Sequence, residues 1–280
     1  ILKLIGIKSA IITTGCERTF HEVLACKLAG IPIVGIQHGA KTRYVSICDF
    51  MPGFDGEKIL TADQFGVWSN WWRDYYLKNS NAFRPEQLFV SGPMRPLKEK
   101  SPCQELKTGP LEVLFISEGL AAPQEVIPYL LTILEAKDFK LFLKFRPYRD
   151  GFELWLKKNQ PEAYQQILEK TKILRGTMEE ATGLCDVVVG SYSTAVLEAL
   201  LQLKSFVFFW TNKWGDHFDI KSFDTAGQFF ADNPQELIEK IKKSVNISKE
   251  DLKKLQERFF GNPYQNGSKW VVDQVEKLLG

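Results

Sequence analysis

The sequence predicts an α/β protein of two domains, each built on a parallel sheet. Two observations carry this prediction. Short apolar segments rich in β-branched residues alternate with helical patterns along most of the 280 residues, as they do where helices cover both faces of a parallel sheet. A polar, charged and proline-bounded segment at 96–110 interrupts the alternation and has the composition of a linker. Two such blocks predict two domains that face a cleft.

The first block, residues 1–95, is expected to form a partial N-terminal domain. Its expected elements are a strand at 10–13, a helix at 19–29, a strand at 33–37, a long loop at 41–61, a short strand and an aromatic-rich helix within 65–79, and a strand within 88–96. The first seven residues contain no methionine and read as the end of a helix that Gly6 stops. They lack the pattern of a signal peptide, and we expect a truncated first domain.

The second block, residues 111–262, restarts the alternation and is expected to form a complete domain. Its expected elements are strands at 111–119, 140–147, 171–174, 187–190 and 206–210, helices at 123–136, 152–170, 177–184 and 194–203, a brief strand and a helix within 227–245, and a helix at 248–259. Residues 263–280 are expected to form a C-terminal helix, for which packing back on the first domain is one arrangement.

Composition excludes several classes of protein. The net charge of +2 at pH 7 gives no bulk attraction for nucleic acid or for an anionic membrane. No run of about 18 uncharged apolar residues is present, so no transmembrane helix is expected. The five cysteines are scattered and form no CxxC pair. This pattern favours reduced thiols in a cytosolic protein over disulfides or a zinc site.

Polar residues follow the predicted strands of the second block, where ligands bind in open parallel sheets. These residues are Ser117-Glu118-Gly119, Arg146-Pro147, Arg175-Gly176 and Ser191-Tyr192-Ser193-Thr194. Hydroxyl groups, free N–H groups at a helix start and an arginine suit a phosphorylated ligand. We therefore assign phosphate binding to Ser191, Ser193, Thr194, Arg146 and Lys144. The alternative is that Ser191 or Ser193 only caps the following helix.

Glu198 lies one turn into that helix, on the same face as Thr194. A buried carboxylate needs partners, because leaving it unpaired costs several kcal/mol. Two ribose hydroxyl groups would supply such partners. Its neighbours are mostly apolar, which favours this ligand role over the alternative of a solvated helix carboxylate.

These segments resemble a known family. The strand "DVVVG" with the following "SYSTAVLEAL" resembles the nucleotide-binding segment of GT-B glycosyltransferases. "VGIQHGA", "GVWSNWWRDYYLKN" and "LFVSGPMR" are similar to segments of bacterial surface-polysaccharide enzymes, including relatives of CDP-glycerol glycerophosphotransferases. "SEG", "KFRP" and "SYST" follow the order of three motifs of sialyltransferases and Kdo transferases, which use CMP-sugars. The resemblance implies a GT-B-like fold with two Rossmann-like domains.

The resemblance also implies roles for single residues. Glu118 matches the acidic residue that acts as general base on the acceptor hydroxyl in the sialyltransferase pattern; the alternative is a carboxylate that caps a turn. Arg146-Pro147 replaces the usual His-Pro pair, so the identity of the nucleotide is left open. His38 matches a histidine that lines the active site, where it could bind phosphate or transfer a proton.

Other histidines and aromatic residues receive structural interpretations. His21 lies among helix residues, and His217 with Asp216 and Asp219 gives only a weak suggestion of a metal site. The loop that holds His217 is expected to contact donor or acceptor. Helical spacing of the aromatic residues favours packing in the core or at a domain interface over stacking on a ligand. These residues are Trp68, Trp71, Trp72, Tyr75 and Tyr76.

We therefore expect a metal-independent glycosyltransferase that needs no cofactor. It would move a sugar from a nucleotide-activated donor, with a CMP-sugar slightly favoured, to an acceptor glycan or lipid-linked glycan. The expected setting is bacterial surface polysaccharide synthesis in the cytoplasm, compatible with peripheral association at the inner face of the plasma membrane. The alternatives are a sugar-nucleotide 2-epimerase, a CDP-glycerol-type glycerophosphotransferase, and a non-catalytic module that binds nucleotide or carbohydrate. No nucleic acid partner is expected.

Overall fold

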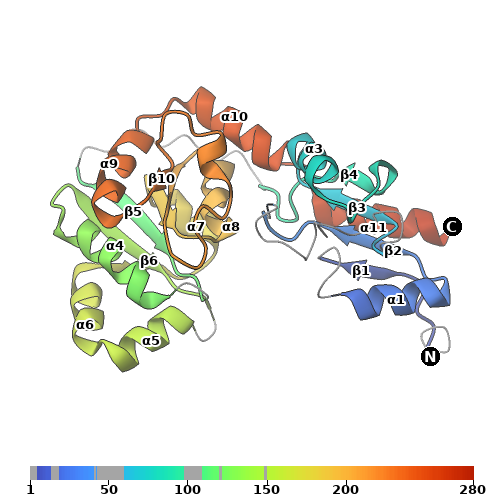
Figure 1. Ribbon diagram of the computed structural model, residues 1–280, viewed down its shortest axis with the longest axis horizontal. Coiled ribbons are helices and arrows are strands. Elements are labelled where there is room, and N and C mark those ends of the chain that lie inside the picture. The colour runs from blue at the N-terminus through green and yellow to red at the C-terminus, as the bar shows by residue number, and fades with distance from the viewer. Residues whose placement is uncertain are drawn as a thin grey trace. The chain divides into compact units, whose positions relative to one another are not determined.

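A computed structural model describes residues 5–13, 19–40, 42, 60–97, 109–119, 122–147 and 150–280. The chain is an α/β protein with two parallel sheets, of four and six strands, which confirms the predicted fold class. It divides into two compact units, and Figure 1 labels their elements. Unit 1 comprises Ile1–Lys100 with Lys254–Gly280, and unit 2 comprises Ser101–Lys253. No described helix is long and apolar enough to cross a membrane.

Unit 1 contains the four-stranded sheet, in the order β1-β2-β3-β4. Its elements are β1 (Ala10–Ile12), α1 (Phe20–Ala29), β2 (Ile33–Ile36), β3 (Gln64–Val67), α3 (Asn70–Asn79), the short 3₁₀ helix η3 (Pro85–Gln87), β4 (Leu88–Val90) and α11 (Gly267–Leu279). Gly30 ends α1 in the left-handed conformation, with φ of 63°, which glycine adopts without steric strain. Ser69 caps α3 by accepting a hydrogen bond from the Trp72 N–H.

The aromatic residues of α3 belong to the core of unit 1, as their helical spacing indicates. Trp72 is fully buried, and its indole N–H donates to the Phe259 carbonyl oxygen at 2.9 Å. Trp68 stacks on Phe260, with ring centroids 5.3 Å apart. Phe259 and Phe260 close helix α10 (Lys249–Phe260), so the last turn of this helix completes the core that α3 begins.

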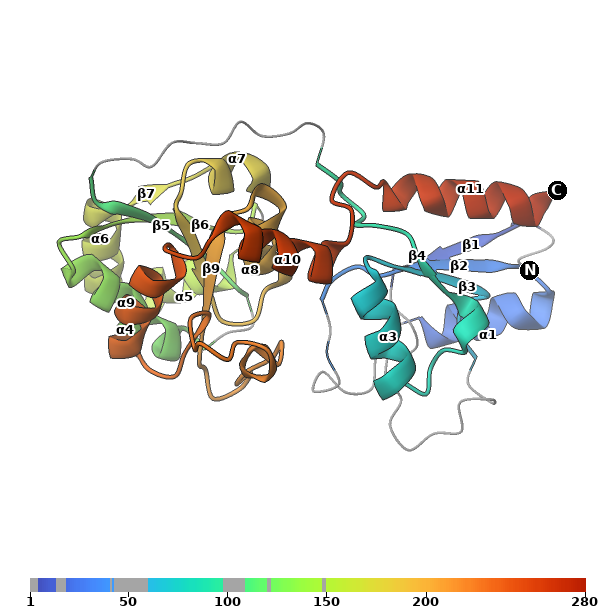
Figure 2. The same ribbon diagram turned by 90° about the horizontal axis from the view of Figure 1, so that it is seen from above.

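Helix α11 packs against the sheet of unit 1, as Figure 2 shows. Val271 of this helix forms a buried cluster with Val34 and Ile36 of β2. Its first residue, Gly267, lies so close to the backbone that a Cβ atom there would be 2.5 Å from the Gly92 carbonyl oxygen. The C-terminal segment of the chain is thus an integral part of unit 1.

Unit 2 contains the six-stranded sheet, in the order β10-β9-β8-β5-β6-β7. Its strands are β5 (Leu111–Ile116), β6 (Phe139–Lys144), β7 (Lys172–Ile173), β8 (Val187–Gly190), β9 (Ser205–Phe209) and β10 (Phe230–Ala231). Its helices are α4 (Pro123–Glu135), α5 (Gly151–Asn159), α6 (Pro161–Lys170), α7 (Met178–Gly183), α8 (Thr194–Leu197), the 3₁₀ helices η4 (Glu198–Gln202) and η5 (Ile220–Ser222), and α9 (Pro234–Ser244).

Two helices of unit 2 differ from the prediction. The helix expected at 152–170 is two helices, α5 and α6, because Pro161 lacks the N–H that would continue the first and instead begins the second. The helix expected at 194–203 is α-helical only over α8 and continues as the 3₁₀ helix η4. Leu203 ends it with a positive φ of 52°.

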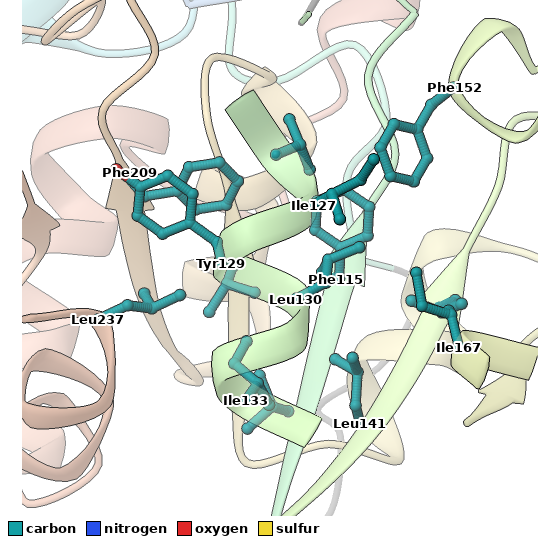
Figure 3. Packing of buried hydrophobic residues seen from close by; sticks show 14 of the residues in the cluster. Phe115, Ile127, Tyr129, Leu130, Ile133, Leu141, Phe152, Ile167, Phe209 and Leu237 are labelled. Atoms are coloured by element: carbon teal, nitrogen blue, oxygen red, sulfur yellow. The ribbon is translucent and has the colours of Figure 1, made fainter. Parts of the chain in front are cut away.

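The core of unit 2 lies between the sheet and the helices that cover it. Figure 3 shows Ile127, Tyr129, Leu130 and Ile133 of α4 directed toward the strands. Tyr129 stacks on Phe209 of β9, with ring centroids 4.3 Å apart. Strand β5 lies at the centre of the sheet, between β6 and β8. The core therefore fixes the ends of these three strands relative to one another.

Candidate functional site

The candidate site lies at the carboxyl ends of β5, β6 and β8 in unit 2. Ile116 is in register with Lys144 on one side, and Phe115 is in register with Val189 on the other. The segments that follow these strands therefore leave the sheet at the same edge. Together with Lys144, the last residue of β6, they contain seven of the eight predicted site residues, the others being Glu118, Arg146, Ser191, Ser193, Thr194 and Glu198. The eighth, His38, belongs to unit 1.

Glu118 reaches from the end of β5 to the turn after β8. Its Oε1 accepts hydrogen bonds from the N–H groups of Tyr192 at 2.9 Å and Ser193 at 2.5 Å. Its Oε2 accepts from the Ser191 N–H at 3.0 Å and from the Ser191 hydroxyl group. Gly190 makes room for this carboxylate, since a Cβ atom there would lie 3.1 Å from Oε1 and 2.6 Å from Val196 Cγ2. One carboxylate thus binds four donors of one turn.

The surroundings of Glu118 revise the expectation of a base that faces a cleft. Its side chain is only 2% exposed, and both oxygens accept hydrogen bonds from the protein. Burial raises the pKa of Glu118, and hydrogen bonds from Ser191, Tyr192 and Ser193 oppose this shift without cancelling it. An acceptor hydroxyl would have to displace these bonds to reach the carboxylate. The alternative of a turn-stabilising carboxylate agrees better with this geometry.

The same contacts revise the phosphate site expected at Ser191. The Ser191 side chain is 1% exposed, and its hydroxyl group donates to Glu118. The N–H groups of Ser191, Tyr192 and Ser193 also donate to Glu118, so the carboxylate occupies the place expected for phosphate. The Ser193 hydroxyl accepts from the Ala195 N–H at 3.3 Å and so caps α8.

Thr194 and Glu198 lie on the half-buried side of the segment after the turn. The backbone N–H of Glu198 donates to the Thr194 carbonyl oxygen, so the two residues are one helical turn apart. Residues this far apart project to the same face of a helix. Their relative placement is therefore the one that the sequence predicted.

A second buried carboxylate, Asp150, organises the neighbouring loops and was missed by the sequence analysis. Its Oδ1 accepts from the Ser117 hydroxyl at 2.8 Å and from the Glu153 N–H at 2.9 Å. Its Oδ2 accepts from the Arg146 N–H at 2.9 Å. Asp150 is the N-cap of α5, and an aspartate directly before a helical pattern is the signal that could have revealed it.

Arg146 and Lys144 are cations at the end of β6. The Arg146 side chain is exposed and lies over Gly119, where an added Cβ atom would be 3.2 Å from Nη1. The Lys144 Nζ donates to the Gly176 carbonyl oxygen at 2.7 Å. Burial lowers the pKa of Lys144, the Glu180 carboxylate opposes this, and the Arg175 charge adds to the lowering. Positive charge therefore gathers at the ends of β6 and β7.

An aromatic cluster links the turn after β8 to the loop after β9. Tyr192 stacks on Trp214, with ring centroids 4.4 Å apart, and both rings contact His217 edge to face. His217 is 8% exposed, and burial lowers its pKa to about 4. Asp216 accepts from the N–H groups of Ile220 and Lys221 within its own loop. Among the described residues, no group of three or more His, Cys, Asp or Glu side chains could hold a metal ion.

His38 lies two residues beyond β2, in unit 1, and its side chain is exposed. The preceding Gln37 is buried and holds Trp68 twice: its side-chain oxygen accepts from the Trp68 N–H at 3.1 Å, and its carbonyl oxygen from the Trp68 indole at 2.9 Å. These bonds fix the backbone that presents His38 at the end of the strand. Lys41 and Arg43, which were expected to add positive charge nearby, lie outside the described residues.

Comparisons with solved structures place this fold among GT-B proteins. No protein-family model matches the sequence, and no curated protein matches it. The S. aureus protein MnaA in complex with UDP superposes with a TM-score of 0.61 at 15% identity, over 99% of this chain and 78% of that one. The UDP-GlcNAc 2-epimerase of Neisseria meningitidis, bound to UDP-GlcNAc, gives 0.61 at 14% identity, over 99% and 78%. MurG of Acinetobacter baumannii gives 0.56 at 16% identity, over 99% and 75%.

These likenesses define the fold of the protein. The chain has a GT-B-like fold, the fold of its structural neighbours. Those neighbours include glycosyltransferases, a wall teichoic acid polymerase and 2-epimerases, so most of them are enzymes.

Proposed function

We propose that this protein is a glycosyltransferase whose unit 2 binds a nucleotide-activated sugar at the carboxyl ends of β5, β6 and β8. One observation supports this most directly. The exposed Arg146 guanidinium lies over Gly119, where two neighbouring strands end beside the turn after β8. A guanidinium group at such an edge can bind phosphate through two parallel hydrogen bonds, and strand ends of this kind are the usual ligand position in open α/β sheets.

In this proposal the cations and the residues after β8 bind different parts of the donor. Arg146 and Lys144 hold phosphate and stabilise the negative charge that develops on the leaving group during transfer. The Thr194 hydroxyl and the Ser193 hydroxyl, which can donate while it accepts from the Ala195 N–H, donate to the same phosphate. Glu198 accepts from the ribose hydroxyls. His38 in unit 1 is proposed to act on the acceptor side, where neutral imidazole can accept a proton near pH 7.

The nucleotide is the part of the donor that the motifs specify least. The order of the "SEG", "KFRP" and "SYST" motifs supports a CMP-sugar, whereas the MnaA complex mentioned above contains UDP. A bacterial surface glycan or its lipid-linked precursor remains the proposed acceptor. Both assignments rest on resemblance, and binding measurements with a series of nucleotides test the first of them.

The test is thermal stabilisation by CMP, CDP, UDP and GDP ligands. A ligand present at about 100 times its dissociation constant stabilises the folded chain by about 2.7 kcal/mol, which a shift in melting temperature would report. We expect one nucleotide to stabilise the protein and Arg146→Ala to abolish the effect. Lys140→Ala is the matched control, because Lys140 is an exposed cation near the start of the same strand. Equal responses of the two variants would contradict the proposed role of Arg146.

A sugar-nucleotide 2-epimerase is the second candidate, because an enzyme of this activity is among the structures that superpose over 99% of the chain. Incubation with a sugar nucleotide that carries the stabilising nucleotide, which is UDP-GlcNAc where that nucleotide is UDP, separates the two functions. An epimerase produces the C2 epimer without any acceptor, which NMR of the anomeric proton detects. A transferase releases free nucleotide, and the release increases with acceptor. Stabilisation by a nucleotide without either reaction would indicate a non-catalytic binding module.

A further inference from the structure

The turn after β8 is held from a distant part of the sequence. The acceptor, Glu118, and the first donor, Ser191, are 73 positions apart. Three successive backbone N–H groups and one hydroxyl group converge on this carboxylate. Such a row of N–H groups forms a concave anion site, and here a side chain of the protein occupies it. We infer that Glu118 is a positioning residue for the donor site, an inference that rests on the proposed function.

The burial of Glu118 supports this assignment. Taking a carboxylate out of water is unfavourable unless hydrogen bonds replace those to water. The turn supplies these bonds, and hydrogen bonds to a charged group are stronger than those between neutral groups. The carboxylate in turn accepts from backbone N–H groups of the turn after β8. Without it, these N–H groups would be buried without an acceptor. Glu118 and the turn therefore stabilise each other in one arrangement.

This arrangement determines where the ligand-binding groups lie. Tyr192 is fixed twice, since its N–H donates to Glu118 and its ring stacks on Trp214. The Ser193 N–H donates to the same carboxylate and Ser193 is the N-cap of α8, so the positions of the Ser193 and Thr194 hydroxyl groups depend on this bond. Glu118 thus acts through Tyr192 on the loop after β9, and through Ser193 on the proposed phosphate ligands.

A positioning residue and a general base differ in their consequences. A base contributes to the chemical step, and its loss lowers kcat while nucleotide affinity is unchanged. A residue that holds the turn affects binding and the local backbone before any chemistry takes place. The two roles can therefore be separated by measurements on the full chain.

The first experiment is hydrogen exchange of single amides in the 280-residue chain, by NMR and without ligand. Glu118→Gln keeps the shape of the side chain but removes its charge and one acceptor. We expect exchange at the Ser191, Tyr192 and Ser193 amides to become about tenfold faster or more, because these amides donate to the carboxylate. The Trp214 indole signal, assigned by its loss in Trp214→Phe, should shift as well.

Asp150→Asn is the matched control, because Asp150 is also 2% exposed and caps its own set of donors. It should speed exchange at the Glu153 amide, which donates to Asp150, and leave the amides of Ser191, Tyr192 and Ser193 unchanged. If Glu118→Gln does not fold, Glu118→Asp serves instead, since it keeps the charge but is one methylene group shorter and so withdraws the carboxylate from the Tyr192 and Ser193 amides. Unchanged exchange at Tyr192 and Ser193 in the variant that folds would overturn the assignment.

The second experiment uses the nucleotide that stabilises the wild-type chain. If Glu118 positions the site, Glu118→Gln raises the dissociation constant of that nucleotide about tenfold. A lower kcat with an unchanged dissociation constant would overturn the assignment in favour of a base. If the wild-type chain binds no nucleotide, the proposed function fails, whereas the exchange experiment still decides whether Glu118 holds the turn.

Discussion

Glu118 and Asp150 both accept hydrogen bonds from loop N–H groups at the edge of the sheet in unit 2. Loops that leave buried strands carry backbone N–H groups that need acceptors. Each carboxylate accepts from several donors at once: Glu118 from the turn after β8, and Asp150 from Ser117, Arg146 and Glu153. Each of these carboxylates links segments that follow different strands. The conformation of the loops at this edge of the sheet therefore depends on the Glu118 and Asp150 side chains.

His217 provides a prediction for pH dependence. Its pKa is lowered by burial to about 4, while the unfolded chain keeps a value near 6.5. Between these values the unfolded state binds the proton and the folded state does not, so stability falls as the pH falls from about 6.5 to 4. The difference corresponds to about 3 kcal/mol. Urea unfolding of the wild type and of His217→Phe, which cannot titrate, should therefore diverge by up to this amount.

The two unfolding profiles should run parallel above pH 7, where histidine is neutral in both states. All other titrating groups are common to the two proteins and cancel in the comparison. Profiles that stay parallel down to pH 4 would show that burial of His217 does not control its protonation.

The sequence predicted which residues lie at the edge of the sheet better than it predicted their hydrogen-bond partners. The strand-end rule located Glu118, Arg146 and Ser191 at the same edge, because parallel strands bring their carboxyl ends together. It could not reveal that the Glu118 carboxylate is buried and accepts hydrogen bonds from the Ser191 turn, since this pairing joins residues 73 positions apart. Hydrogen bonds between distant segments follow from the packed sheet, which no local pattern describes.

At the scale of elements, the alternation of strands and helices was sufficient to predict the parallel sheets. Apolar β-branched runs such as Val187–Val189 are fully buried in β8. Lengths of helices were harder to predict. Pro161 divides a continuous helical pattern into α5 and α6, and η4 follows α8 although its residues favour an α-helix. The first difference is a local effect of proline, whereas the second is not visible in the helix propensities of the residues.

Helix α11 provides a prediction about close packing. A Cβ atom on Gly267 would lie 2.5 Å from the Gly92 carbonyl oxygen and 2.9 Å from that of Pro93. Both are backbone atoms, so Gly267→Ala must displace the helix. We expect the free energy of unfolding to fall by about 2 kcal/mol, as for an overpacked core. Urea unfolding followed by circular dichroism measures this change.

Gly183→Ala is the matched control for that substitution. Gly183 is the last residue of α7, and an added Cβ atom would meet only the Gln202 side-chain oxygen, at 3.4 Å. A change within about 0.5 kcal/mol is expected there. If the free energy of unfolding fell equally in the two variants, the close approach of α11 to Gly92 would not be the reason why glycine is needed at position 267.

At the scale of the whole molecule, each unit has a hydrophobic core of its own. The large cluster in unit 2 draws its buried residues from 113–241, and the cluster under α11 joins β2 to the last helix of the chain. Unit 1 is discontinuous in sequence, because its last element follows unit 2 along the chain. The helix α11 that covers its sheet is therefore synthesised only after the whole of unit 2.

This discontinuity predicts that loss of α11 destabilises one unit and not the other. Removing residues 267–280 exposes Val34 and Ile36, which pack against Val271 and against Trp270, Val275 and Leu278 of this helix. We expect hydrogen exchange of β2 and β3, measured by mass spectrometry, to accelerate strongly, because these strands lose the apolar cover of one face. Exchange of β5, β6 and β8 should stay as in the full chain. Removal of only Leu279 and Gly280 is the control and should alter neither sheet. Equal acceleration in both sheets would show that the two cores unfold together, and the units would then form one cooperative body.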